Sequence, residues 1–261
     1  MAALAAAGCA AHVRSYNRLR LHTDAGEFVF EYADADRAAT AQVEEAVSKA
    51  SAELARWGGL REPVTLRVLP SHQALEEAVN RPGYGWLRAW GRYDEVFVQS
   101  PRTWALFQVP QRDVDELILH ELAHAAMYQQ SADRTHWRRK GIPGWFREGM
   151  ASFIAQQGFR WPSLEDLARF YERHPSADPV GDPDALYQHE DRFAYGAAHH
   201  AFTFLVRRYG VERVRGVLSS MREGRSFDDA FERTLGLSSG RFIKDFNRYL
   251  RLRGFRGERV H

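Results

Sequence analysis

A chain of 261 residues can form one large domain, or two small lobes, around a hydrophobic core of its own. Its content of 44% hydrophobic and 13% aromatic residues excludes an intrinsically disordered protein, and a formal net charge of +2 argues against a nucleic-acid partner. The single cysteine, Cys9, excludes an internal disulfide and a cysteine-rich metal site.

The first seven residues are apolar, mostly alanine, and lead into Gly8-Cys9. This pattern resembles the end of a bacterial lipoprotein signal, in which the cysteine is lipidated after cleavage. The run lacks a preceding positive charge, however, and it is short beside the roughly 7–15 apolar residues of a secretory signal. We interpret residues 1–15 as a signal remnant or a disordered tail and Cys9 as a candidate lipid anchor. The location therefore stays open between the bacterial cell envelope and the cytoplasm.

Strand and helix patterns alternate through the first hundred residues, which predicts a small mixed sheet with helices packed on it. The predicted elements are a hairpin at 19–32, a helix at 36–57, a strand at 64–69, a short helix after Ser71 and a strand at 95–99. Aromatic residues and arginines interleave at 86–93. We interpret that segment as a turn whose aromatics pack under the sheet, in preference to a nucleic-acid or carbohydrate surface.

Strand patterns end near residue 101, and the rest of the chain predicts helices. Asp113, with Glu116 three residues later, predicts the start of a helix that runs to about residue 130. The basic loop that follows includes 136–140, a rim that would favour acidic substrates. Further helices are predicted at 145–157, 163–173, 193–209, 211–222, 226–235 and 239–252, with a long loop at 175–191. The fold class is α+β. We expect a single domain at 16–261, with a sheet-bearing lobe (16–130) and a helical lobe (131–261).

The predicted helix at 113–130 carries the sequence His120-Glu121-Leu-Ala-His124. Two histidines four residues apart lie on the same face of a helix, so both imidazoles can reach one metal ion. Glu121 lies beside them, close enough to act on a metal-bound water without being a ligand. The alternative is a pair of core histidines, but a buried Glu121 would then need a charge partner of its own.

Catalytic zinc takes three protein ligands and keeps one position open for water. Glu148 is the candidate third ligand, because it is an acidic residue in an otherwise apolar predicted helix. Gly149 follows directly and would allow another helix to approach closely. The alternative for Glu148 is a surface ion pair with Arg147 or another arginine. We expect one Zn²⁺ per chain.

Together, the His120–His124 motif and the downstream Trp-Phe-Arg-Glu148-Gly-Met-Ala segment resemble the gluzincins, specifically the bacterial peptidase MA-like group. The resemblance covers about residues 60–250 and implies a compact thermolysin-like (zincin) core. It further implies that the strand at 95–99 is the edge strand of the sheet, with which a peptide substrate would pair. A third histidine at the metzincin spacing after His124 is absent from the sequence, which excludes that family.

The resemblance implies a metallopeptidase mechanism in which Glu121 is the general base. It also implies a tyrosine or histidine on a downstream helix that stabilises the oxyanion, for which Tyr195 is our candidate and His199 the rival or helper. Thermolysin-type enzymes have an aspartate four residues after the glutamate ligand, where it orients a zinc-bound histidine. This chain has Ser152 there, which would orient a ligand more weakly.

Three functions remain open on the sequence alone. The first is an active zinc peptidase, expected to be a monomer, whose exo- or endopeptidase character the sequence leaves open. The second is a catalytically weak or inactive module of the same fold that binds or senses a ligand. The third is a zinc hydrolase of a non-peptide amide. The intact Glu121 favours an enzyme, because a structural metal site needs no general base.

Overall fold

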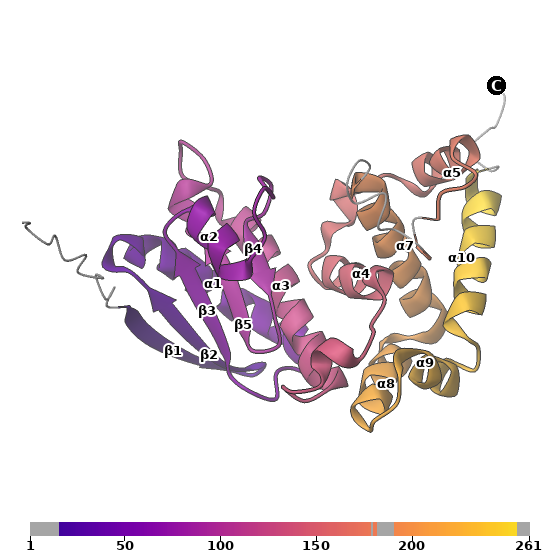
Figure 1. Ribbon diagram of the computed structural model, residues 1–261, viewed down its shortest axis with the longest axis horizontal. Coiled ribbons are helices and arrows are strands. Elements are labelled where there is room, and N and C mark those ends of the chain that lie inside the picture. The colour runs from indigo at the N-terminus through magenta and orange to yellow at the C-terminus, as the bar shows by residue number, and fades with distance from the viewer. Residues whose placement is uncertain (1–15, 179, 182–190, 255–261) are drawn as a thin grey trace, which may run out of the picture.

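The computed structural model describes residues 16–178, 180–181 and 191–254, so Cys9 and the start of the chain lie outside the described residues. Figure 1 shows two lobes side by side along the long axis. One contains the sheet with helices α1–α3, and the other contains α4, α5 and α7–α10. This arrangement confirms the predicted α+β class, with the sheet in the N-terminal part of the chain. In the described part of the chain, no helix is long and apolar enough to span a membrane.

Five strands form a mixed sheet in the order β1-β2-β3-β5-β4. β1 pairs antiparallel with β2, β2 and β5 both pair parallel with β3, and β4 pairs antiparallel with β5. The strands are β1 (Asn17–Thr23), β2 (Gly26–Tyr32), β3 (Val64–Leu69), β4 (Ala89–Gly91) and β5 (Glu95–Gln99). The predicted hairpin and the strands at 64–69 and 95–99 are confirmed.

The expectation that the strand at 95–99 forms the sheet edge is wrong. β5 lies between β3 and β4, with Ala89 opposite Val98 and Gly91 opposite Val96. The edge is therefore β4, a strand of only three residues, which is too short to show an alternating pattern in the sequence.

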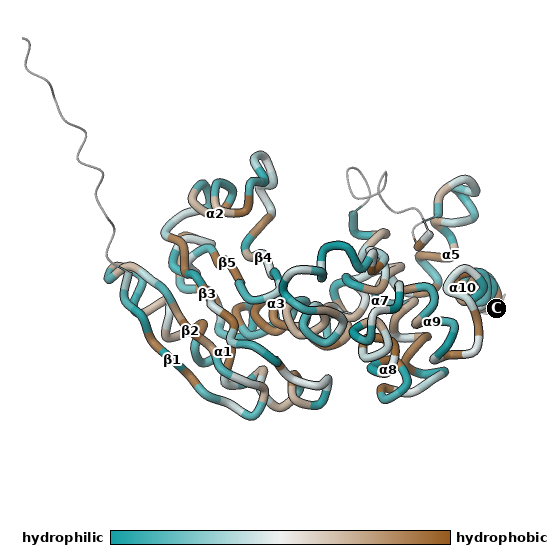
Figure 2. The backbone as a smooth tube through the Cα atoms, turned by 60° about the horizontal axis from the view of Figure 1, so that its bottom comes forward, coloured by the Kyte–Doolittle hydropathy of each residue, from teal (hydrophilic) through white to brown (hydrophobic). Residues whose placement is uncertain are grey.

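The two faces of the sheet bury different side chains because neighbouring strand residues point to opposite sides. Val68, Val96 and Val98 belong to the core cluster that includes α1 (Arg37–Arg56) and α3 (Gln111–Ser131). Leu69 and Phe97 point the other way and pack with α2 (His72–Val79). Figure 2 shows hydrophobic stretches along the strands and along α3. α3 thus packs on the sheet.

The N-terminus of α3 differs from the prediction. Asp113 does not cap it, because the helix begins at Gln111, and Pro110 precedes it without a side-chain hydrogen bond. A proline needs no hydrogen-bond acceptor for its nitrogen and fixes its own φ, so it can begin a helix without a capping side chain. The predicted C-terminus near residue 130 is confirmed by the observed end at Ser131.

The helical lobe confirms the predicted helices to within about two residues, with one exception. Its helices are α4 (Gly144–Ile154), α5 (Leu164–Arg173), α7 (Asp191–Tyr209), α8 (Val211–Arg222), α9 (Phe227–Leu235) and α10 (Ser239–Gly254). The exception is α4, expected to reach Gln157. It ends at Ile154 because Gln156 adopts a left-handed conformation (φ +56°), and a separate 3-10 turn, η4 (Gln157–Arg160), follows.

Gly149 allows α4 and α7 to pack closely, as expected. A Cβ atom on Gly149 would lie 2.7 Å from the Cβ of Phe202 and would also collide with the carbonyl oxygen of Ala198. We predict that Gly149→Ala lowers the free energy of unfolding by about 1–3 kcal/mol, because overpacking outweighs the gain in helix propensity. Denaturant unfolding measures the change. The control Gly240→Ala places a methyl group where nothing lies within 4 Å, so equal destabilisation of both variants would contradict the packing argument.

Candidate metal centre

His120, His124 and Glu148 converge from two helices. Both histidines lie on α3, with ring centroids 4.9 Å apart, and Glu148 lies on α4. Glu148 Oε2 is 3.7 Å from His120 Nε2 and 3.5 Å from His124 Nε2. All three side chains offer ligand atoms within 4.8 Å of one another. The sequence placed these residues on two predicted helices, and the structure brings them together.

The distances fit a tetrahedral zinc ion better than a direct ion pair. Zinc bonds of about 2.0–2.1 Å place neighbouring tetrahedral ligands about 3.3 Å apart, close to the observed 3.5 and 3.7 Å. A charge-assisted N–H···O hydrogen bond would instead be about 2.7–2.9 Å. Two imidazoles and one carboxylate, with a fourth position left open, are also a ligand set of catalytic zinc sites. The residues present therefore fit a zinc ion.

The electrostatics of the triad keep Glu148 ionised, as a ligand must be. Burial acts to raise the pKa of Glu148, but the neighbouring His124 and His120 hold it well below its ordinary value. For His120, burial acts to lower the pKa, but the opposing effects of Glu148 and Glu121 raise it overall. Glu148 and His120 therefore stabilise each other's charged form in the absence of a metal.

The two histidines are oriented in different ways. His120 Nδ1 lies 2.9 Å from Gln157 Oε1, an oxygen that only accepts hydrogen bonds. His120 Nδ1 therefore carries the proton, which leaves Nε2 as the free ligand atom. His124 Nδ1 is buried with no hydrogen-bond partner among the described residues, and its ring stacks on Tyr128 (6.2 Å, 16°). Packing therefore orients His124.

Glu121 lies beside the triad, against the edge of the sheet. Its Oε2 accepts a 2.5 Å hydrogen bond from the backbone N–H of Gly91 on β4. Only 8% of Glu121 is exposed, and the described residues offer no hydrogen-bond donor to Oε1. One carboxylate oxygen is thus fixed by the sheet edge while the other stays available.

Gly91 allows the sheet edge to lie against the metal-binding helix. A Cβ atom there would lie 2.6 Å from the backbone oxygen of Glu121 and 3.0 Å from its Oε2. We predict that Gly91→Ala lowers the free energy of unfolding by about 1–3 kcal/mol, because β4 must move away from α3. Denaturant unfolding tests this. Gly85→Ala, at a glycine with nothing within 4 Å, is the control, and an unchanged stability of Gly91→Ala would show that the contact is loose.

Ser152 does not orient a metal ligand, contrary to the expectation. Its hydroxyl lies 2.9 Å from His199 Nδ1, and the Trp161 indole N–H donates to Ser152 Oγ at 2.7 Å. Gln157 orients His120 in place of Ser152. Tyr195 lies one turn before His199 on α7, and its ring stacks on Trp161 (5.4 Å, 17°). Of the two oxyanion candidates, Tyr195 thus contacts Trp161 directly, and His199 is linked to Trp161 through Ser152.

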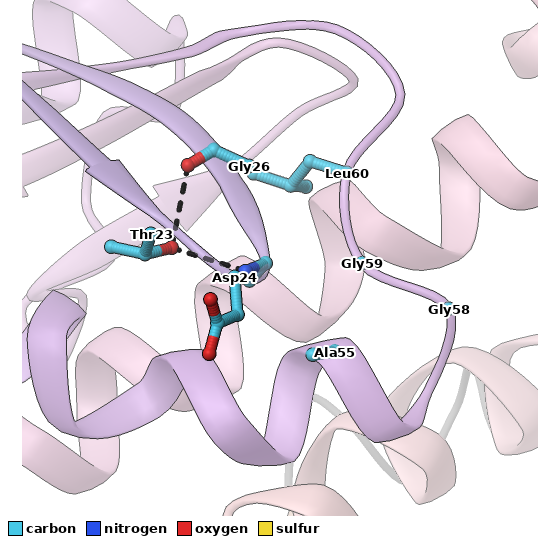
Figure 3. A pocket seen from close by; sticks show the side chains of 8 residues that line it. Thr23, Asp24, Gly26, Ala55, Gly58, Gly59 and Leu60 are labelled. Carbon is cyan, nitrogen blue, oxygen red and sulfur yellow. Dashed lines mark hydrogen bonds between the residues drawn. The ribbon is translucent and has the colours of Figure 1, made fainter.

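Three other parts of the surface are of interest: the aromatic segment 86–93, the basic loop at 136–140 and a hollow beside the β1–β2 turn. Of the aromatics expected to pack under the sheet, Tyr93 is 1% exposed and Trp90 packs with the cluster that contains Leu69 and Phe97, but Trp86 is 57% exposed. Within the rim loop, Lys140 donates a 2.5 Å hydrogen bond to the carbonyl oxygen of Met221, near the C-terminus of α8. Figure 3 shows a hollow beside the β1–β2 turn. Thr23, which lines it, donates through Oγ1 to the Gly26 carbonyl oxygen and accepts from the Ala25 N–H. No triad residue lines that hollow.

No protein-family model matches the chain, and no curated protein matches it either. The proposed function therefore depends on the geometry of the triad and of the residues around it.

Proposed function

We propose that the protein is a zinc-dependent peptidase of the gluzincin type, with His120, His124 and Glu148 as metal ligands and Glu121 as general base. The observation that supports this most strongly is the convergence of the three ligand atoms within 4.8 Å, on a helix that also carries Glu121. A structural zinc site would be closed by a fourth protein ligand, often a cysteine. Among the described residues, the metal-ligand group contains three members and no cysteine.

When bound, zinc would polarise the substrate carbonyl and lower the pKa of its bound water to about 7. Glu121 would accept a proton from the attacking water through Oε1, because Oε2 accepts the hydrogen bond from the Gly91 N–H. The same oxygen would then donate that proton to the leaving amine. His199 and Tyr195 are the candidates for the hydrogen bond that stabilises the oxyanion.

A peptide substrate is proposed to bind along the β4 edge. Backbone hydrogen bonds from Gln99 N–H to Arg88 oxygen (2.8 Å) and from Arg92 N–H to Glu95 oxygen (2.7 Å) join β4 to β5. In an antiparallel pair the backbone groups alternate in direction, so those of Ala89 and Gly91 face away from β5. The Gly91 N–H already donates to Glu121, so a peptide would pair with the Ala89 groups and the Gly91 carbonyl. An extended peptide added there would run beside Glu121, which already lies against Gly91.

The test is the metal content of the purified protein together with hydrolysis of a broad peptide library. We expect about one zinc per chain, loss of hydrolysis after chelation and its return with added zinc. Zinc binding without hydrolysis of any peptide would favour the alternative of a binding or sensing module. Absence of zinc, even after reconstitution, would overturn the proposal.

A further inference from the structure

A chain of hydrogen bonds joins three elements beside the triad. Trp161, just after η4, donates through Nε1–H to Ser152 Oγ on α4, and Ser152 Oγ contacts Nδ1 of His199 on α7. Ser152 is 1% exposed and His199 9% exposed. The hydrogen bond between Ser152 and His199 is therefore shielded from water, which would otherwise compete for it.

The direction of each hydrogen bond follows from its groups. An indole nitrogen only donates, so Ser152 Oγ accepts from Trp161. The hydroxyl hydrogen of Ser152 then needs an acceptor, and among the described residues the acceptor within reach is His199 Nδ1. An Nδ1 that accepts carries no proton, so a neutral His199 must carry its proton on Nε2.

We propose that Trp161 and Ser152 are positioning residues that fix His199 as a neutral donor with its proton on Nε2, available to a substrate. The catalytic purpose of this donor rests on the proposed peptidase function, but its tautomer does not. Burial, and then the charge of His200, lower the pKa of His199 to about 4, so the ring is neutral near pH 7. A neutral donor stabilises a developing oxyanion without giving up its proton.

Gly158 lies directly beside His199 Nε2. A Cβ atom on Gly158 would lie 2.9 Å from His199 Nε2, which is hydrogen-bond distance. Any side chain there would fill the position that an acceptor needs to reach Nε2. The neighbouring Gln157 holds His120, so the segment 157–161 lies against both a metal ligand and His199.

The test is ¹⁵N NMR of the histidine rings in the zinc-loaded protein, with His199→Gln to assign the resonance. ¹⁵N shifts distinguish the two neutral tautomers, and we expect the Nε2–H form in the wild type. In Ser152→Ala the Nδ1–H form should appear, and in Trp161→Phe the preference should weaken. The matched control is Trp104→Phe, which removes an indole N–H that donates a 2.8 Å hydrogen bond to the Gln99 carbonyl in the other lobe.

Activity supplies the second readout. In Ser152→Ala and Trp161→Phe we expect kcat to fall about tenfold at unchanged KM and zinc content, since a donor is misplaced but not removed. An Nδ1–H tautomer in the wild type, or an unchanged tautomer in Ser152→Ala, would overturn the proposal. So would a Trp161→Phe effect no larger than that of Trp104→Phe. Failure of the peptidase function alone would leave the NMR result intact, so the two failures are distinguishable.

Discussion

Replacing Glu121 by glutamine should leave zinc binding intact and reduce peptide hydrolysis by about 10²- to 10⁴-fold. Glutamine has the same shape and can still accept the Gly91 N–H hydrogen bond, so the sheet edge should stay in place. It cannot accept the proton of the attacking water, because an amide is not a base at neutral pH. Steady-state hydrolysis of a peptide found in the library, with metal content measured on the same sample, tests this expectation.

Asp113→Asn is the matched control for Glu121→Gln. It makes the same carboxylate-to-amide change on α3, at a side chain that is 37% exposed and pairs with Arg112. Its activity should equal that of the wild type. Full activity of Glu121→Gln would contradict the general-base role, whereas loss of zinc from that variant would show that Glu121 is needed to build the metal site.

Removing a ligand should weaken zinc binding strongly. In Glu148→Ala and His124→Ala we expect the affinity for zinc to fall by on the order of a hundredfold or more, with loss of all hydrolysis. The reason is that partners outside the ligand set already contribute about 10- to 100-fold to metal affinity. Gln157→Ala, which removes the hydrogen bond to His120 Nδ1, should therefore give an intermediate loss within that range. Competition with a chromogenic chelator measures all three affinities.

His22→Ala is the control for the ligand variants, because it removes an exposed histidine on β1. Its zinc affinity should equal that of the wild type. A Glu148→Ala variant with wild-type affinity would show that the carboxylate serves only as a charge partner of the histidines.

The local part of the candidate site was predictable from sequence because it depends on spacing within one helix. His120 and His124 share a face of any α-helix, and Glu121 follows from its place between them. Glu148 needed an additional argument, that zinc requires a third ligand, and Gly149 beside it suggested a close helix contact that the structure confirms.

Contacts between elements distant in sequence were not predictable. Gln157 was expected to end α4, yet it lies on a separate turn and holds His120. Ser152 stands where the spacing would let it orient a ligand only weakly, and its contacts with His199 and Trp161 depend on how α7 crosses α4. Gly91 lies in a three-residue strand whose existence depends on pairing with β5 and not on its own sequence.

The division of the ligands between α3 and α4 has a consequence for the whole molecule. α3 contributes Ile118 and Leu122 to the core of the sheet-bearing lobe and Ala123 and Met127 to the core of the helical lobe, in which α4 lies. An ion held by both helices would bind only when α4 is packed on α3, so its binding free energy would add to the packing between the two helices. Chelation would then weaken the contact between α3 and α4. A packing defect such as Gly149→Ala would weaken the affinity for the metal without altering any ligand.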